Sequence, residues 1–177
     1  MAMDQEARRA VVAALVRLAG SSDYQDRADA GVAMAGFAEM PEAIQPLSQF
    51  LLDAADTFVT WATAEALLRR KDLTGLTLVA RALADADDNH AGWIVAAVRD
   101  VFMIYASERA AAVRACDVLI NDPDPRHRRG AVQLRGTLVA IDPILHPAGE
   151  TWARSTGSGQ PQHPLLPPSE CTSAGQV

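Results

Sequence analysis

The stretch NDPDPRHRRGAVQLRGTL, residues 121–138, determines the fold that we expect for this chain. Asp124 is a natural helix N-cap, because its carboxylate can accept a hydrogen bond from a free backbone amide of the first turn. Pro125 suits the first helical position, where its missing N–H has no consequence and its φ is already helical. Apolar residues then share one helical face: Ala131, Leu134 and Leu138. The stretch therefore predicts a capped amphipathic helix over residues 124–141.

Apolar residues recur with helical spacing along most of the chain, and no window alternates with the period of a strand. Asp or Pro residues stand at most of the expected helix starts, and Gly, Ser or Pro residues follow several of the expected ends. We expect helices over eight segments: 4–18, 23–39, 41–54, 56–70, 73–83, 89–105, 108–119 and 124–141. The sequence therefore predicts an all-α protein.

Composition favours a folded core of small side chains. The 177 residues are 49% hydrophobic but only 5% aromatic, so Ala, Leu and Val must fill the core. The net charge of −6 makes the chain self-repelling, and an acidic chain does not attract phosphate backbones as a whole. Neither a secretory signal at the N-terminus nor an apolar run long enough to span a bilayer is visible. We therefore expect a cytoplasmic protein without a membrane partner.

Four expected N-caps recur at a nearly constant interval. They are spaced 33, 32 and 36 residues apart (56 − 23, 88 − 56 and 124 − 88): Asp23, Asp56, Asp88 and Asp124. Each of these caps opens a longer helix, and a shorter helix follows. A period of this length carried by helix pairs is typical of an α-solenoid, in which each pair buries its apolar face against the next. We expect a short α-solenoid of about four antiparallel helix pairs within residues 1–144, with a compact helical bundle as the alternative.

Two segments carry a family resemblance. Residues 122–134 place an Asp at the helix start, Arg128 in the first turn and an Ala-rich face beyond it, and residues 23–34 do the same around Arg27. Both segments resemble the short HEAT-type repeats of bacterial proteins, in the HEAT/armadillo class. The resemblance implies a row of inner helices whose Ala-rich faces pack on neighbouring repeats. The second copy departs from it with Thr60 in place of the Arg. The tetratricopeptide repeat has a similar period, but its Trp…Leu-Gly…Tyr signature is absent.

The composition changes after Ile141. Six of the ten prolines lie beyond that residue: Pro143, Pro147, Pro161, Pro164, Pro167 and Pro168. Such a segment cannot bury enough apolar surface to offset the entropy of ordering it. We therefore expect residues 145–177 to form a disordered tail. A short docking peptide at residues 165–168 is the alternative interpretation of its leucine–proline run.

Side chains with catalytic or metal-binding chemistry form no recognisable motif. The zinc-protease helix, the serine-hydrolase elbow, the phosphate-binding glycine loop and the dinucleotide fingerprint are missing. Read as a calcium loop from Asp85, the acidic run places His90 where glycine is needed, so we interpret it as a solvated turn. Cys116 and Cys171 offer no metal spacing, and we expect no disulfide between them. We therefore expect no cofactor, no metal and no catalysis. A small enzyme or an enzyme regulator stays a third hypothesis without assignable residues.

The expected architecture favours a protein-interaction module. In a solenoid the inner helices line an extended concave surface that binds other proteins, and here these would be the second, fourth, sixth and eighth helices. The candidate partner contacts are side chains in their first turns: Tyr24, Arg27, Thr60, His90, Arg126, Arg128 and Arg129. We interpret Trp61 and Trp93, at near-equivalent repeat positions, as core residues, with a stacking or ligand pocket as the alternative.

Nucleic-acid binding is the alternative function. Residues 124–140 carry four Arg and one Asp, which makes this helix the basic patch of the chain. The resemblance extends to HEAT-like solenoids that bind DNA, including base-excision enzymes. The overall acidic charge opposes this function, and a solvated end helix explains the arginines as well. Neither the identity of a partner nor the oligomeric state follows from the sequence.

Overall fold

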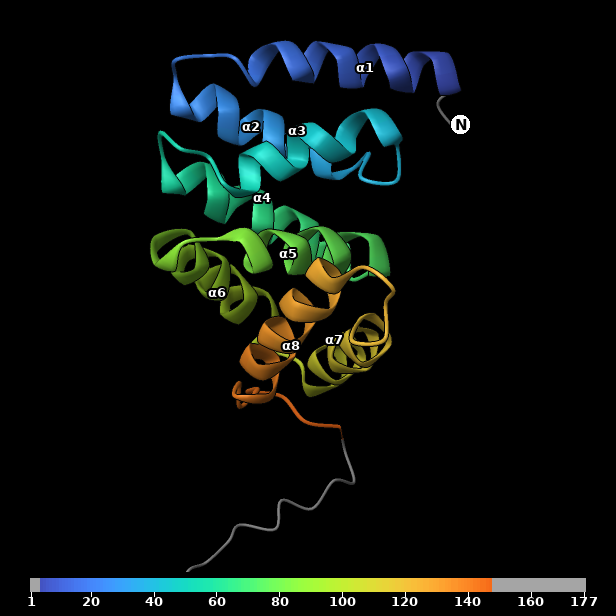
Figure 1. Cartoon of the computed structure of the whole chain (residues 1–177), viewed down its shortest axis with the longest axis vertical. Coiled ribbons are helices and arrows are strands. Elements are labelled where there is room, and N and C mark those ends of the chain that lie inside the picture. Colours follow the sequence, from blue (N-terminus) through green and yellow to red (C-terminus); the bar gives the residue numbers. More distant parts are fainter. Residues whose placement is uncertain (1–3, 148–177) are drawn as a thin grey trace, which may run out of the picture.

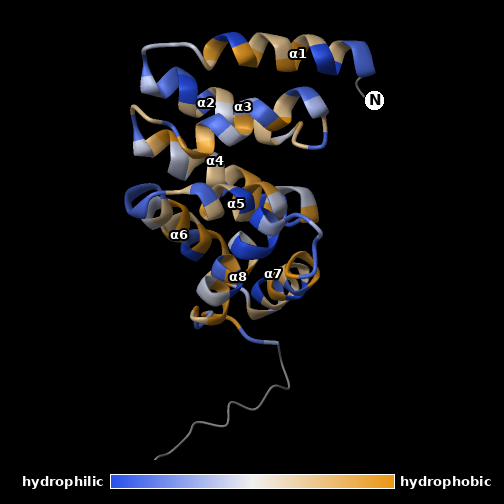
Figure 2. Cartoon of the chain, viewed as in Figure 1, coloured by the Kyte–Doolittle hydropathy of each residue, from blue (hydrophilic) through white to orange (hydrophobic). Residues whose placement is uncertain are grey.

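The computed structural model describes residues 4–147 and builds this range from α-helices (Figure 1). They are α1 (Gln5–Leu18), α2 (Tyr24–Ala35), α3 (Pro41–Leu51), α4 (Thr57–Arg69), α5 (Leu73–Asp85), α6 (Asp88–Phe102), α7 (Ala106–Leu119) and α8 (Pro125–Val139). The predicted all-α class is confirmed. Apolar and polar residues alternate around the helices (Figure 2), and none of those within residues 4–147 is both long and apolar enough to cross a membrane.

Aspartate side chains define where most helices begin. At each such start the carboxylate accepts a hydrogen bond from a first-turn amide: Asp4, Asp23, Asp56, Asp72, Asp87 and Asp124. The carboxylate also lies at the positive end of the helix dipole, which adds to the stabilisation. The prediction of Asp88 as the cap of α6 is wrong by one residue, because the Asp87 side chain accepts from the amide of His90 at 2.8 Å.

Helices α2, α3 and α6 end three or four residues earlier than predicted, and at α2 and α6 another backbone conformation competes with the helix. After α2, tight turns take over, and the amide of Met40 donates to the Phe37 carbonyl at 2.8 Å. After α6, Tyr105 has an extended backbone, precedes α7 as its N-cap residue and pairs with Leu145 in an isolated parallel bridge. Apolar periodicity continues through these turns, so it does not reveal where the helix stops.

The chain stays attached to the helices beyond the predicted end of the domain. The amide of Leu145 donates to the Ile104 carbonyl at 2.8 Å, and the amide of Ala106 donates to the Leu145 carbonyl at 2.9 Å. Leu145, the first residue of the predicted tail, is therefore hydrogen-bonded to the segment between α6 and α7. The rest of the predicted tail, residues 148–177 with its leucine–proline run, lies outside the described residues.

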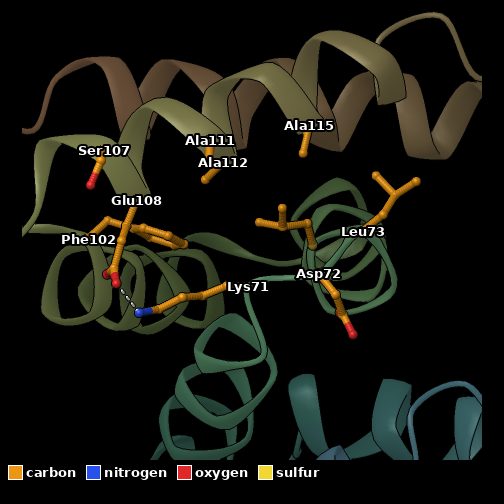
Figure 3. Close-up of a pocket in the computed structure, with 10 residues that line it drawn as sticks. Lys71, Asp72, Leu73, Phe102, Ser107, Glu108, Ala111, Ala112 and Ala115 are labelled. Atoms are coloured by element: carbon orange, nitrogen blue, oxygen red, sulfur yellow. Dashed lines mark hydrogen bonds and ion pairs between the residues drawn. The ribbon is translucent and has the colours of Figure 1, made fainter.

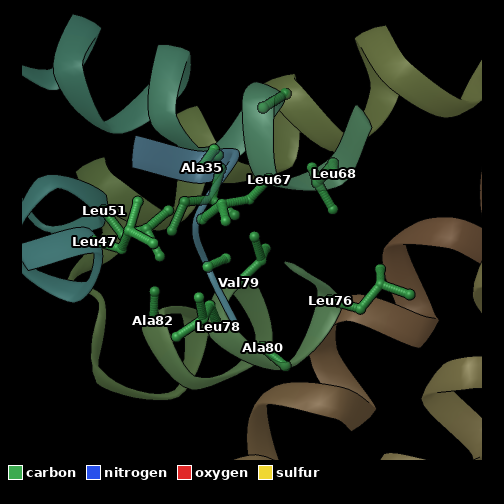
Figure 4. Close-up of a cluster of buried hydrophobic side chains, with 14 of the residues drawn as sticks. Ala35, Leu47, Leu51, Leu67, Leu68, Leu76, Leu78, Val79, Ala80 and Ala82 are labelled. Atoms are coloured by element: carbon green, nitrogen blue, oxygen red, sulfur yellow. The ribbon is translucent and has the colours of Figure 1, made fainter. Parts of the chain in front are cut away.

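The helices α2, α4 and α6 form one row of packed neighbours, with α1, α3 and α5 beside it (Figure 1). Gly31 shows how closely α2 and α4 approach, since a Cβ added there would lie 2.1 Å from Oγ1 of Thr63. Between the two layers lies a buried cluster of Ala, Leu and Val side chains, which includes Leu47, Leu67 and Val79 (Figure 4). The stacked row gives the described chain a solenoid-like architecture.

The row ends at α6, because α8 packs mainly on α5 and α7. A Cβ added to Gly130 would lie 1.6 Å from the carbonyl oxygen of Ala80, so glycine permits direct contact between the α8 and α5 backbones. Arg129 strengthens the same contact by donating from Nη2 to the Ala84 carbonyl at 2.8 Å. The prediction that the eighth helix lines one surface with the second, fourth and sixth is therefore wrong.

The Gly130 contact predicts that alanine substitutions at two glycines of α8 have opposite effects on the free energy of unfolding. Gly130→Ala should lower the free energy of unfolding by about 3 kcal/mol, because the new methyl group forces α8 away from α5. Gly136→Ala is the matched control, because a Cβ added there would have no atom within 4 Å. It should raise the free energy of unfolding by about 0.5–1 kcal/mol through helix propensity. Urea unfolding measures both, and equal effects would contradict the close contact.

Candidate functional site

Aromatic side chains gather on the exposed side of α2 and α4. Tyr24 opens α2 and meets Phe58 of α4 in a T-shaped contact, with ring centroids 5.9 Å apart and planes at 88°. Phe58 also contacts Trp61, with centroids 5.6 Å apart and planes at 34°. Edge-to-face and tilted geometries of this kind are favourable for aromatic pairs. Tyr24 is 41% exposed and Phe58 is 44% exposed. We call these three residues the aromatic row.

Helix α6 places an acidic and an aromatic side chain, Asp100 and Trp93, beside α4. Trp61 of α4 donates from Nε1 to Oδ2 of Asp100 on α6 at 3.0 Å. Trp93 lies two turns before Asp100 on the same face of α6, and it is 44% exposed. The interpretation of Trp93 as a core residue is therefore wrong. Trp61 is half-buried, because one edge packs on the core while its indole N–H reaches Asp100.

Phe58 is not among the predicted contact residues, although the sequence carries a signal for it. It follows the Asp56 cap by two residues and lies off the helical stripe of Ala64, Leu67 and Leu68, all of which are fully buried. A large apolar side chain that points away from the buried stripe of its own helix indicates an exposed aromatic. The signal is weak because apolar residues cover most of the circumference of α4.

Carboxylates are numerous on the three helices α2, α4 and α6 that carry the aromatic row and Trp93. Along α2, α4, α6 and their caps, the acidic residues that are exposed or half-exposed are Asp23, Asp26, Asp29, Asp56, Glu65, Asp87, Asp88 and Asp100. The arginines with comparable exposure on these segments are Arg69, Arg70 and Arg99. Glu65 holds Arg69 in an i,i+4 ion pair at 2.6 Å, and Arg70 pairs with Glu39 and Asp72 outside these segments. Most other cationic side chains lie on the remaining helices, so this face carries a local excess of negative charge.

Arg27 lies beneath this face and holds it together. It is 7% exposed, and it donates from Nε and Nη2 to the two carboxylate oxygens of Asp53 at 2.8 and 3.1 Å. Its Nη1 donates to the Ser21 carbonyl at 3.0 Å. Asp53 also accepts from the backbone amides of Ala55 and Asp56. Because its guanidinium is engaged and buried, Arg27 cannot touch a partner in this structure.

The electrostatics of Arg27 and Asp53 favour their charged forms. Burial pushes the pKa of Asp53 upward, but the hydrogen bonds from Arg27 and the two backbone amides outweigh it and leave the pKa below its ordinary value. The hydrogen bond to Asp53 raises the pKa of Arg27. Both ions are well partnered, which is the condition under which a buried pair is tolerated.

His90 links the turn before α4, which contains Asp53, to α6. Its Nε2 lies 3.0 Å from the Asp53 carbonyl oxygen, and its Nδ1 lies 2.7 Å from Oδ1 of Asp87. The Asp53 carbonyl, followed by Asp87, raises the pKa of His90 against the effect of burial. Arg27, Asp53 and His90 thus connect α2, the α3–α4 turn and α6. We call these three residues the clamp.

The other predicted contacts have different surroundings. Thr60 is fully buried, so it cannot contact a partner here either. Arg128 donates to the carbonyls of Asp122 and Pro123 at 2.9 and 2.8 Å. Arg126 and Arg129 both lie near the Asp85 carboxylate, at 3.7 and 3.6 Å. The arginines of α8 are exposed but largely compensated within the chain, so the nucleic-acid function stays a prediction.

Two grooves flank the start of α5. One, of about 240 Å³, lies between α5 and α7, and an ion pair of Lys71 with Glu108 borders it (Figure 3). Lys71 has φ 55° and ends α4 in the left-handed conformation that usually favours glycine. The other, of about 300 Å³, lies between α3 and α5 beside His127. The surface of both grooves is mainly apolar, although polar side chains also line them, which suits packing or binding.

Neither a metal-binding cluster nor a reactive cysteine is found in the part of the chain that the structure describes. Between residues 4 and 147, no three His, Cys, Asp or Glu side chains are placed to hold a metal ion. Cys116 is fully buried, and burial raises the pKa of its thiol to about 11, so the thiol stays protonated. No family model, curated protein or solved structure matches the chain. The geometry of the described helices therefore has to carry the functional argument.

The contacts of the clamp predict how much the free energy of unfolding falls when the Arg27 guanidinium is removed. Arg27→Leu should lower the free energy of unfolding by about 3 kcal/mol, because Asp53 then keeps a buried charge without its partner. The double variant Arg27→Leu with Asp53→Asn should recover part of this loss, since the neutral amide oxygen still accepts from the two backbone amides. Urea unfolding of both variants tests the account, and an equal or greater loss in the double variant would contradict it.

The raised pKa of His90 predicts a pH-dependent contribution to stability. The charged imidazole is favoured in the folded state, so its contribution is complete below the unfolded pKa of about 6.5 and is lost as the pH rises through the higher folded pKa. The difference in unfolding free energy between the unmodified protein and His90→Gln should therefore shrink from pH 6 to pH 8.5. Urea unfolding across this range measures it, and the other histidines cancel in the comparison. A constant difference would contradict the assignment.

Proposed function

We propose that this chain is a cytoplasmic, non-catalytic interaction module, a HEAT-like repeat protein that binds another protein on the exposed face of α2, α4 and α6. The observation that carries the proposal is the aromatic row together with Trp93, which lie on the neighbouring helices α2, α4 and α6 and of which Tyr24, Phe58 and Trp93 are exposed. Exposed aromatics are enriched at the centres of protein interfaces, where they account for much of the binding energy. A contiguous group of them is costly to leave in water and indicates a binding surface.

The clamp supports the proposal because it makes the face rigid. Arg27, Asp53 and His90 tie the first turns of α2 and α6 to the turn that precedes α4. Tyr24 stands on the first turn of α2 and Phe58 on the first turn of α4, so these rings are positioned before a partner arrives. A preorganised surface loses less conformational entropy on binding, which leaves more of the interaction energy for affinity.

Nucleic-acid binding through α8, the alternative function that the sequence suggested, has weaker support. Its arginines lie near Asp85 or donate to carbonyl oxygens of the same chain, and the whole chain carries a net charge of −6. A phosphate backbone would have to replace these contacts and overcome the overall repulsion.

Site-specific photocrosslinking tests the proposal. A photoreactive benzoylphenylalanine replaces Phe58 or Trp93 in turn, and replaces Val118 of α7, which is 62% exposed, as the matched control. In cells that produce the protein, the first two positions should give the same protein adduct, and the third should not. The adduct should survive nuclease digestion.

Equal adducts from all three positions would contradict the proposed face. Loss of the adduct on nuclease treatment would transfer the function to nucleic-acid binding.

A further inference from the structure

We propose that the segment bound on this face is cationic, and that Lys or Arg side chains of the partner lie against the aromatic row. The inference rests on the proposed function and adds the chemistry of the partner. It follows from two properties of one surface, exposed aromatic rings and uncompensated carboxylates, neither of which alone specifies an occupant.

The rings supply the first property. The T-shaped contact of Tyr24 with Phe58 and the tilted contact of Phe58 with Trp61 leave ring surface open to solvent. The face of an aromatic ring is negative, and it attracts an ammonium or guanidinium group within about 6 Å of its centroid. The chain already contains such a contact, since the Arg8 guanidinium carbon lies 5.6 Å from the centroid of the Phe37 ring.

Charge complementarity supplies the second property. Asp100 is held against the aromatic row by the indole of Trp61, and none of the ion pairs within residues 4–147 includes it. Asp29, in the second turn of α2, is likewise exposed and outside those ion pairs. Complementary potentials favour a cationic partner on such a face, whereas an acidic segment would be repelled. The two properties therefore select the same class of occupant.

A second copy of this chain fits the face less well than a separate partner. The exposed arginines of α8 are engaged within the chain, with Arg126 and Arg129 near Asp85 and Arg135 bonded to Asp117 at 2.6 Å. Seating them on a neighbouring copy would require these contacts to break. The exposed arginines Arg17 and Arg114 are outside the ion pairs of the described residues, but they lie on two different helices, α1 and α7, and do not form a cationic segment. We therefore assign the face to a Lys- or Arg-rich segment of another protein.

Binding of hexa-arginine by the full-length chain, measured by calorimetry, tests the inference. Asp100→Asn removes one charge while its amide oxygen can still accept from Trp61, and Phe58→Ala removes the central ring. Each should weaken binding about three- to tenfold. Asp142→Asn is the matched control, because this exposed carboxylate follows α8 and lies outside the face. It should leave the affinity unchanged, and hexa-glutamate should not bind.

Three outcomes would overturn the inference: no binding of hexa-arginine at millimolar concentration, equal weakening by Asp100→Asn and Asp142→Asn, or self-association of the chain that Asp100→Asn abolishes. The photocrosslinking experiment separates this failure from that of the proposed function. If Phe58 and Trp93 still give a common protein adduct that hexa-arginine does not displace, the interaction face stands and only the cationic partner is excluded. Without that adduct, the face itself is excluded.

Discussion

The buried ion pair between Arg27 and Asp53 is the interaction on which the exposed face depends. Two buried charges are tolerated only when nearly all of their hydrogen bonds are formed. Here the Arg27 guanidinium donates two hydrogen bonds to the Asp53 carboxylate, which also accepts hydrogen bonds from two backbone amides. His90 adds the sixth helix to the same turn. Long-range polar contacts thereby set the mutual positions of three helix starts, which apolar stacking alone would leave free to slide.

The close approach of helices is the second constraint. A core with few aromatics has small side chains between its helices, and glycine at Gly31 and Gly130 removes even the Cβ at the closest points. Close contact increases dispersion interactions and leaves space for few large rings inside the described helices, where Phe50 and Phe102 are buried. Tyr24, Phe58 and Trp93 lie at the surface of a protein whose interior is built mainly from Ala, Leu and Val.

The placement of α8 separates the two kinds of charge on the molecule. By packing on α5 and α7, α8 carries its arginines away from the row of α2, α4 and α6. The row keeps its excess of carboxylates, while Asp85 at the end of α5 compensates two of the arginines. A regular fourth repeat would have placed these arginines next to the acidic face and neutralised it. The irregular end of the stack thus preserves the charge of the candidate interface.

Local interactions explain what the sequence by itself determined. Helical class, the number of helices in the described range and most of their starts depend on capping and apolar spacing over a few residues, so Asp23, Asp56 and Asp124 could be identified directly. Neighbouring acidic residues compete for the same amides, which is why Asp87 and Asp88 could not be distinguished. The repeat period likewise revealed stacking, because each helix pair must bury its apolar face on another.

Only the tertiary structure decided which polar residues are buried and which aromatics are exposed. The repeat pattern places Arg27 and Thr60 in first turns as well as Tyr24, yet burial of the first two depends on the distant Asp53 and on the packing of α4. The course of α8 depends on a glycine meeting a backbone carbonyl 50 residues away in sequence (130 − 80). Periodicity reports the apolar face of one helix and contains no information about which neighbour covers it. For this reason the sequence determined the helices, and only their packing decided where the candidate binding face lies.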